Sequence, residues 1–387
     1  MQKPTRAAAQ PRGTFAPPST VKKIDLGLQG GGAHGAFTWG VLDRLLAEER
    51  IEIEGISGTS AGAMNAVVVA DGLVEGGRNA ARDALARFWR AVSDAGRNSP
   101  IQRTWLDQML GRWTLDFSPG FIAMDLVSRL VSPYDLNPLN INPLRDLVAG
   151  LVDFERVNRC ETPKIFLSAT HVSTGRPHVF KAPHITVDAV MASACLPFMF
   201  QAVEIDGEAY WDGGYMGNPV LYPLIDETTA RDLVVVQINP LVREGVPRSA
   251  RDILNRVNEI SFNASLVKDI RAILLLKEYA SAAEHHDERL SNLMLHRIHA
   301  EHDLVDLGVS SKMNAEWAFL EYLHDIGWRA ADEWVAAHWD DLGAKSTYPL
   351  EHALWGVEMA NAVSVVAPSS ASKASASEEG ALKGDAA

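Results

Sequence analysis

The sequence KKIDLGLQGGGAHGAFTWGVLDRLL, residues 22–46, changes character twice. Its apolar run KIDLGL (23–28) predicts a strand, three consecutive glycines interrupt the chain, and an amphipathic pattern from about Phe37 to Glu49 predicts a helix. A glycine loop at the start of a helix presents bare backbone N–H groups, where an anion is favoured. The stretch therefore predicts a strand, a loop and a helix that together hold an anionic group.

Two kinds of anion suit such a loop. Gly30, Gly32 and Gly35 satisfy the G-x-G-x-x-G pattern of a dinucleotide-binding turn, in which backbone N–H groups hold a pyrophosphate. The same donors could instead hold the oxyanion formed during acyl transfer. The glycines alone leave both alternatives open, because both ligands need bare backbone donors.

A second motif follows one strand later, in GISGTSAGAMNAVVVA (55–70). Residues Gly58 to Gly62 fit G-x-S-x-G, between a predicted strand at 51–57 and a predicted helix from Ala61 to about Asp71. In that context the pattern predicts a nucleophile elbow with Ser60 exposed at the carboxyl end of the strand. It disfavours the dinucleotide hypothesis, because the ribose-binding acid expected about 20 residues after the glycines would fall where the strand enters the serine turn.

A third motif lies in EAYWDGGYMGNPVLYPLI (208–225), where Asp212 precedes Gly213 and Gly214. An acid before glycines is commonly a turn former. Next to a nucleophilic serine, it is also a candidate base for the serine proton.

The three motifs, in this order, resemble the patatin-like phospholipase family of bacterial type. A softer similarity is MASACLPFMFQAVEIDG (191–207), a run of small residues that reaches Pro197 ahead of the Asp212 motif. The resemblance covers residues 24–240 and extends to about residue 300. It implies a three-layer α/β/α fold with a mainly parallel central sheet and a helical insertion or cap. Its implied activity is hydrolysis of carboxylic ester bonds in lipids, of phospholipase A type, without a cofactor or metal.

The resemblance also assigns roles to residues. Ser60 is the implied nucleophile and Asp212 the base, with no histidine between them. Desolvation of Asp212 is expected, since a carboxylate of ordinary pKa near 4 accepts a hydroxyl proton poorly. The implied oxyanion donors are backbone N–H groups of Gly30, Gly31, Gly32 and Ala61. Further motif residues are His34, Gly35, Gly58, Gly62, Gly213 and Gly214.

The glycine loop departs from the family at one position. The family usually carries Arg or Lys where this chain has His34, so a group that titrates near neutral pH replaces a permanent cation. Three roles stay open for His34: orienting the loop, adding charge when protonated, or only packing beside the helix start.

Other mechanisms remain as alternatives. A Ser-His-Asp triad of an esterase or polyester depolymerase would use a histidine after Asp212. The candidates are His285, His286, His296, His299 and His302. The runs AEHHDE and HRIHAEHD suggest a metal site, but they lack an H-E-x-x-H motif. A non-catalytic scaffold is a further alternative, although both the serine and the aspartate are present.

Composition limits the partners and the compartment. The chain has 387 residues and a formal net charge of -13, which argues against non-specific binding to nucleic acid. Its two cysteines, Cys160 and Cys195, are too few for a disulfide framework. With no signal-peptide pattern and no run of about 18 apolar residues, the chain is expected to be cytoplasmic, peripheral to a membrane at most. Export without a cleaved signal and the oligomeric state stay open.

The expected organisation is an acyl hydrolase domain at 21–300, a helical extension at 301–366, and disordered ends at 1–20 and 367–387. Further strands are predicted at 164–170, 178–180, 202–211, 232–238 and 293–300, and long helices at 249–290 and 312–339. The four tryptophans of the last helix (Trp317, Trp328, Trp334 and Trp339) are expected to pack it against its neighbours. The run 352–367 predicts an amphipathic surface helix.

A helical insertion is predicted at about 88–151. Its apolar side chains have three open roles: packing a cap onto the sheet, lining an acyl channel, or contacting a lipid interface. They are Trp105, Met109, Trp113, Phe117 and Phe121.

Overall fold

The three motifs lie on one mainly parallel sheet. The computed structural model describes residues 21–243, 245–282 and 288–348. The sheet has the strand order β5-β6-β3-β2-β1-β7-β8, with β4 paired to β3. Its parallel strands are β3 (Lys164–His171), β2 (Ile51–Gly58), β1 (Lys22–Leu28), β7 (Asp232–Gln237) and β8 (Met294–His299).

The register brings the motif-bearing strand ends level with one another. Leu28 of β1 pairs with Gly58 of β2, which in turn pairs with Leu167 of β3. The antiparallel strand β6 ends at Asp212, opposite Ala169 near the carboxyl end of β3. The other antiparallel strands are β4 (Pro177–Lys181), β5 (Val203–Ile205) and β6 itself (Glu208–Asp212). The glycine loop, the serine elbow and the aspartate therefore meet at one edge of the sheet.

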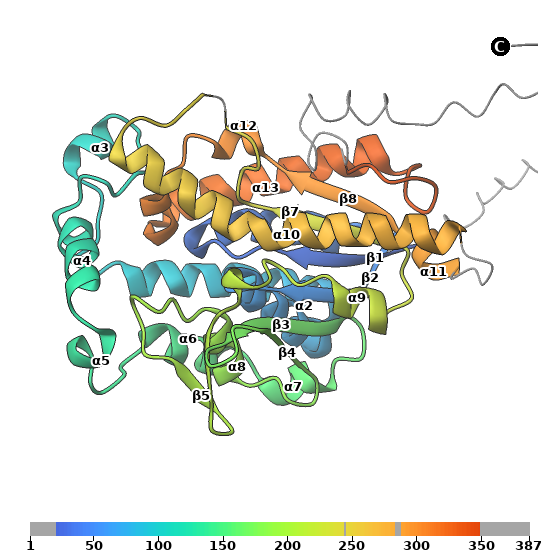
Figure 1. The fold of residues 1–387 in the computed structure, drawn as a ribbon, viewed down its shortest axis with the longest axis horizontal. Helices are drawn as coiled ribbons and strands as arrows, with labels where there is room; N and C mark the ends of the chain where they lie inside the picture. Colours follow the sequence, from blue (N-terminus) through green and yellow to red (C-terminus); the bar gives the residue numbers. More distant parts are fainter. Residues whose placement is uncertain (1–20, 244, 283–287, 349–387) are drawn as a thin grey trace, which may run out of the picture. The chain divides into compact units, whose positions relative to one another are not determined.

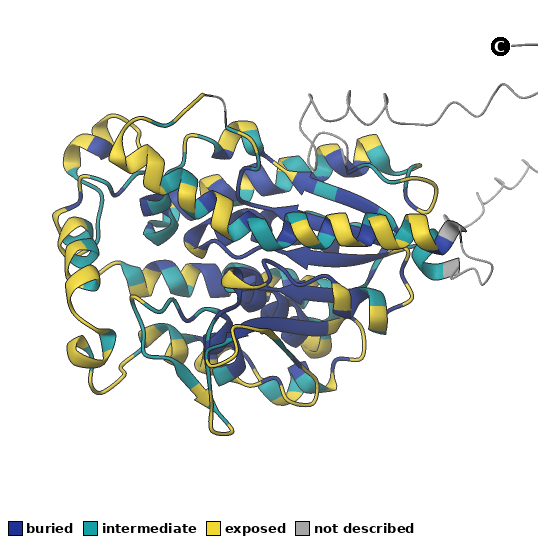
Figure 2. Cartoon of the chain, viewed as in Figure 1, coloured by how far each residue is buried: buried dark blue, intermediate teal, exposed yellow. Residues whose placement is uncertain are grey.

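Helices cover both faces of this sheet. In Figure 1, α10 (Ala250–Ala282) crosses in front of the strands, and α2 (Ala61–Gly96) lies behind them. Figure 2 shows that the strands between these layers are buried almost throughout. The shorter helices around the sheet are α7 (Phe154–Arg159), α8 (Val187–Ser193), α9 (Tyr222–Glu227), α11 (Glu288–Ser291) and α12 (Glu301–Leu304). The predicted α/β/α fold with a mainly parallel sheet is confirmed.

Two helices from opposite ends of the described chain make backbone contact. α1 (Gly35–Ala47) crosses α13 (Trp317–His338), and the crossing places a glycine of each helix against the other helix. A Cβ on Gly40 would collide with the carbonyl oxygen of His324, and a Cβ on Gly327 with that of Phe37. Glycine at both positions is therefore what allows the two axes to approach so closely.

The tryptophans of the last predicted helix pack as expected. The indole of Trp317 lies 5.9 Å from that of Trp39 on α1, and Trp334 is buried in the core. Trp328 and Trp339 contact the guanidinium groups of Arg44 and Arg50.

The insertion begins later than predicted. Helix α2 continues to Gly96 through a non-helical break at Gly76 and Gly77, and buries Phe88 and Trp89 in the core. The expected start near residue 88 is therefore wrong: apolar contacts with the sheet extend the second helix, and the insertion proper follows Gly96.

The insertion consists of α3 (Trp105–Met109), α4 (Pro119–Leu130), α5 (Pro133–Leu136) and α6 (Pro143–Leu151). Each helix starts at a side-chain N-cap, from Thr104, Ser118, Ser132 and Asn142. Neither α4 nor α5 contains a buried residue. Capping and, in α4, α5 and α6, a proline at the first turn define these short helices more than burial does.

The last long helix also starts later than predicted. Residues Val309–Met313 form a 3-10 turn, η3, and α13 begins only at Trp317. The predicted helix at 249–290 corresponds to α10 and α11, and residues 283–287 between them lie outside the described residues. The same holds for both predicted disordered ends and for the predicted helix at 352–367.

The described residues up to Tyr348 form one compact unit, which includes β8 and α13. Cys160 and Cys195 are both free and buried. Across the described ranges, no helix combines the length and the apolarity needed to cross a bilayer.

Candidate active site

Ser60 occupies a strained turn between β2 and α2. It is the N-cap residue of α2, with φ 54° and ψ −118°, a conformation that costs a non-glycine residue about 1–3 kcal/mol. The turn is closed by a hydrogen bond from the Gly62 N–H to the Thr59 carbonyl (2.8 Å), and the Ser60 N–H donates to Ser193 Oγ (2.9 Å). The sequence motif thus forms the predicted elbow.

The glycine loop lies directly against this serine. A Cβ on Gly30 would come within 2.8 Å of both Ser60 Cβ and the Thr59 carbonyl oxygen, so only glycine fits without movement. The loop continues into the 3-10 turn η1 (Gly32–His34), where Gly32 has φ 58°. Loop and elbow therefore form one site.

One predicted oxyanion donor is already occupied. The Gly30 N–H donates to Asn218 Oδ1 at 2.6 Å, and the Gly30 carbonyl accepts from Asn239 Nδ2 at 3.3 Å. The prediction that Gly30 is a free oxyanion donor is therefore wrong, because its peptide is held from both sides. For the N–H groups of Gly31, Gly32 and Ala61, the structure contains no acceptor among the residues that it describes.

Asp212 is buried beside Ser60. Its Oδ1 accepts a hydrogen bond from the Gly214 N–H (2.7 Å), and the nearby Ser60 side chain favours its ionised form. Its backbone is fixed too, since the Asp212 N–H donates to the Cys195 carbonyl at 2.8 Å. Burial raises the pKa of the Asp212 carboxyl to about 7, against the opposing effects of the Gly214 N–H, the Ser60 side chain and the charge on Lys312. Asp212 is therefore desolvated, as expected from its proposed role as the base.

His34 is a neutral residue that fastens the loop. Its side chain is buried, with Nε2 2.8 Å from Ser311 Oγ and the ring edge-on to Phe319. Burial, reinforced by the charge on Lys312, lowers the pKa of His34 to about 3. A histidine with this pKa carries no charge near neutral pH, and the hydrogen bond to Ser311 favours orientation of the loop over packing alone.

Sequence reasoning missed a network of buried amides under the loop. Gln29 Nε2 donates to Asn263 Oδ1 (3.0 Å), and Gln29 Oε1 accepts from the backbone N–H groups of Ile238 and Asn239. Asn218 follows the aspartate motif and Asn239 follows β7. Their positions directly after these segments could have indicated, from the sequence alone, that they lie near the site. No feature of the sequence indicated that Lys312, on η3, lies near the loop.

Two of the candidate triad histidines, His296 and His299, are bonded to groups away from Ser60 and Asp212. His296 lies between Thr347 Oγ1 (3.0 Å) and Asp232 Oδ1 (2.9 Å), and His299 Nε2 accepts from Arg297. Within the described ranges, no histidine hydrogen-bonds to Ser60 or Asp212, and no group of three potential ligands could hold a metal ion. His285 and His286 lie outside the described residues.

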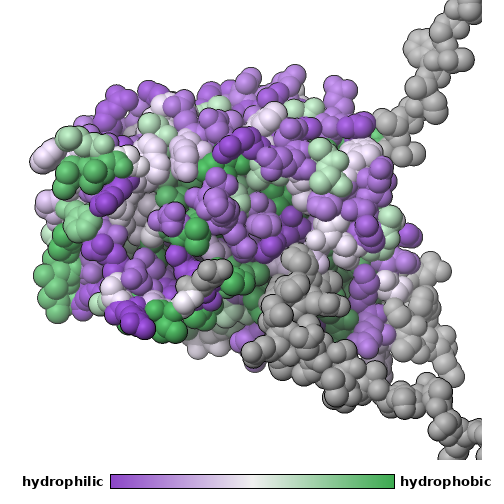
Figure 3. Space-filling model, turned by 90° about the horizontal axis from the view of Figure 1, so that it is seen from above, coloured by the Kyte–Doolittle hydropathy of each residue, from purple (hydrophilic) through white to green (hydrophobic). Residues whose placement is uncertain are grey.

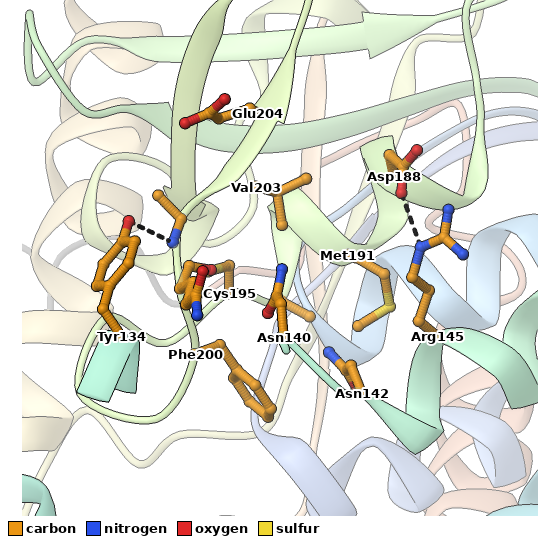
Figure 4. Close-up of a pocket in the computed structure, with 13 residues that line it drawn as sticks. Tyr134, Asn140, Asn142, Arg145, Asp188, Met191, Cys195, Phe200, Val203 and Glu204 are labelled. Carbon is orange, nitrogen blue, oxygen red and sulfur yellow. Dashed lines mark hydrogen bonds and ion pairs between the residues drawn. The ribbon is translucent and has the colours of Figure 1, made fainter. Parts of the chain in front are cut away.

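A cavity of about 390 Å³ adjoins the site without including either Ser60 or Asp212. Figure 4 shows it between the insertion, which contributes Tyr134 and Arg145, and the segment with Asp188 and Cys195. Arg145 and Asp188 form an ion pair of 2.9 Å across it. The wall that carries Asp188 and Cys195 also carries Ser193, the partner of the Ser60 N–H.

Comparison with known proteins gives consistent matches. The model of the family "Patatin-like phospholipase" matches residues 26–225. A cGAMP-activated phospholipase of Escherichia coli (strain TW11681) is 28% identical over 220 residues, which cover 51% of this chain and 53% of the relative. This chain therefore spans about half the length of that relative.

Two solved structures also match. VipD of Legionella pneumophila has 14% identity and a TM-score of 0.34, over 81% of this chain and 67% of that one. The ExoU chain matched in the ExoU–SpcU complex of the Pseudomonas aeruginosa type III secretion system has 17% identity and a TM-score of 0.28, over 89% and 70%.

Proposed function

Because this chain belongs to the patatin-like phospholipase family, we propose that it is a serine acyl hydrolase of phospholipase A type that cleaves carboxylic ester bonds of lipids. The observation that carries the proposal is the buried Asp212 carboxyl beside the glycine loop, whose pKa is raised by burial and lowered in part by the adjacent Ser60 side chain. The close contact of Gly30 with Ser60 favours an oxyanion over a pyrophosphate as the anion of this loop.

In the proposed mechanism, Ser60 Oγ attacks the ester carbonyl carbon while its proton passes to Asp212. The N–H groups of Gly31, Gly32 and Ala61 stabilise the oxyanion, each donor being worth about 3 kcal/mol. When the intermediate collapses, the C–O bond to the alcohol breaks and Asp212 returns the proton to the leaving oxygen. Water then attacks the acyl-enzyme with Asp212 again as the base, which releases the fatty acid and restores Ser60.

The substrate proposal draws on the surface of the insertion. Trp105 and Met109 on α3 are 72% and 75% exposed, and Leu126 and Leu130 on α4 are exposed as well. Figure 3 shows apolar residues gathered at the end of the molecule that carries these helices. Such a surface suits contact with a lipid interface better than packing of a cap, whereas Trp113 packs inward against Phe319.

The proposed chemistry is tested by labelling with a fluorophosphonate probe and mapping the adduct by mass spectrometry. We expect one adduct, on Ser60, because only an activated serine reacts readily with such a probe. Vesicles of phosphatidylcholine should accelerate labelling and release free fatty acid if the lipid surface is the site of action. Folded protein that stays unlabelled both with and without vesicles would identify a non-catalytic scaffold instead.

The rate of ester cleavage should fall on the acidic side of pH 7. Asp212 acts as a base only when ionised, and burial raises its pKa to about 7. Below that pH, kcat/KM for a soluble ester should drop about tenfold per pH unit. Initial rates between pH 5 and pH 9 measure this limb. A profile that stays flat down to pH 5 would contradict the assignment, since it would require a base of ordinary carboxyl pKa.

A further inference from the structure

Lys312 brings a cation to the glycine loop from a distant part of the chain. It lies on η3, whose backbone contacts the loop so closely that a Cβ on Gly32 would collide with the Lys312 carbonyl oxygen. Its ammonium donates to Asn239 Oδ1 (2.8 Å) and Asn258 Oδ1 (3.1 Å), and lies 5.4 Å from the centroid of the Phe262 ring. The charge is thus held by neutral oxygens and a ring face.

The carboxylate that stabilises the charge of Lys312 most, Glu259, also binds two arginines. Glu259 accepts from Arg243 at 2.7 Å and from Arg256 at 3.3 Å. Glu259 has a larger effect on the pKa of Lys312 than Asp212 has, but Glu259 is shared with two arginines, and the charge of Lys312 acts on Asp212 as well. Asn239, one of the two amide partners of the Lys312 ammonium, also donates to the Gly30 carbonyl, so Lys312 is connected to the loop through a single side chain.

We propose that Lys312 is a positioning residue of the ester hydrolase, which holds the Gly30–Gly32 loop through Asn239 and keeps the base and the oxyanion in their charged forms. The proposal rests on the proposed function of the Ser60 site. It assigns to η3 the cationic role that the neutral His34 side chain cannot fill.

The charges that face Lys312 agree with this role. They are Asp212 at the end of β6 and Glu259 on α10, which both raise the pKa of Lys312, and the buried His34 of η1. Burial outweighs the two carboxylates and lowers the pKa of Lys312 to about 8. In turn Lys312 lowers the pKa of Asp212, while the neighbouring Cys195 and Tyr215 are neutral near pH 7. The active state, with Asp212 ionised and Lys312 protonated, is therefore favoured between about pH 7 and pH 8.

The test is the pH dependence of kcat and KM in the full chain with Lys312→Met, which removes the charge and keeps most of the length of the side chain. We expect kcat at pH 7.5 to fall about tenfold to a hundredfold with little change in KM for a soluble ester. The acidic limb should move to higher pH, because Asp212 loses a charge that lowers its pKa, and the alkaline limb near pH 8 should vanish. A merely structural role would not shift the limbs in this way.

Two further variants complete the test. Lys312→Arg should recover most of kcat and the original acidic limb but lose the alkaline limb, since arginine stays charged. It therefore decides the matter even if Lys312→Met folds poorly: an alkaline limb that persists near pH 8 would overturn the proposal. Lys345→Met, at a lysine side chain that is 71% exposed, should behave as the unmodified protein. If the unmodified protein cleaves no ester and leaves Ser60 unlabelled, the proposed function itself fails; unchanged profiles in active variants would refute only the role of Lys312.

Discussion

Ser60→Ala and Asp212→Asn should each reduce ester turnover by about 10⁴-fold or more, because members of a nucleophile–base pair act as a unit. Alanine removes the attacking oxygen. Asparagine nearly preserves the size of Asp212 and can still accept from the Gly214 N–H. It cannot, however, take the proton of Ser60. Fatty acid release from phosphatidylcholine vesicles, normalised to folded protein, measures both losses.

Controls for this prediction lie among residues of the same types. Asp325→Asn, at a carboxylate that is 76% exposed, should retain full activity. His299→Ala and His302→Ala should do so too, as should substitutions of His285 and His286. If any of these histidine variants lost turnover while remaining folded, a Ser-His-Asp triad would replace the proposed dyad.

Gly327→Ala should destabilise the protein by about 1–3 kcal/mol through overpacking of the contact between α1 and α13. The added methyl group would collide with the backbone carbonyl of Phe37, and the backbone nitrogen of Val41 would lie 3.1 Å from it. Backbone atoms on a buried helix cannot rotate aside as a side chain would, so the two helices must separate. Thermal or denaturant unfolding of the full chain measures the change.

Gly150→Ala is the matched control. Gly150 also lies in a helix, α6, but a Cβ there would meet nothing within 4 Å. Alanine should therefore stabilise this position by about 0.5–1 kcal/mol, the ordinary gain in helix propensity. If both substitutions raised the free energy of unfolding by the same amount, α1 and α13 would not be in backbone contact.

The sequence was sufficient for features whose cause is local. Apolar runs predicted the strands to within a few residues, and small residues at fixed spacing predicted the serine elbow with its strained Ser60. Contacts between distant segments gave no such signal. The bonds of Gly30 to Asn218 and Asn239, which occupy one expected donor, depend on how loops after β6 and β7 fold back onto the first loop.

The environment of titrating groups was likewise invisible in the sequence. His34 suggested a group that titrates near neutrality, and only its burial against Ser311 and Phe319 shows otherwise. The extension of α2 to Gly96 had a similar cause, because Phe88 and Trp89 could be assigned to the core only once their neighbours in space were known.

The contact between α1 and α13 also sets an order of events during synthesis. Phe37 and Gly327 lie 290 positions apart (327 minus 37), and a ribosome adding about 5–20 residues per second needs roughly 15–60 s to cover that distance. Throughout this interval α13 has not yet been synthesised, so the apolar face of α1 against which it packs lacks its native partner. The nascent chain should therefore depend on chaperones at this surface, and the helix that begins at the glycine loop should be secured only late in translation.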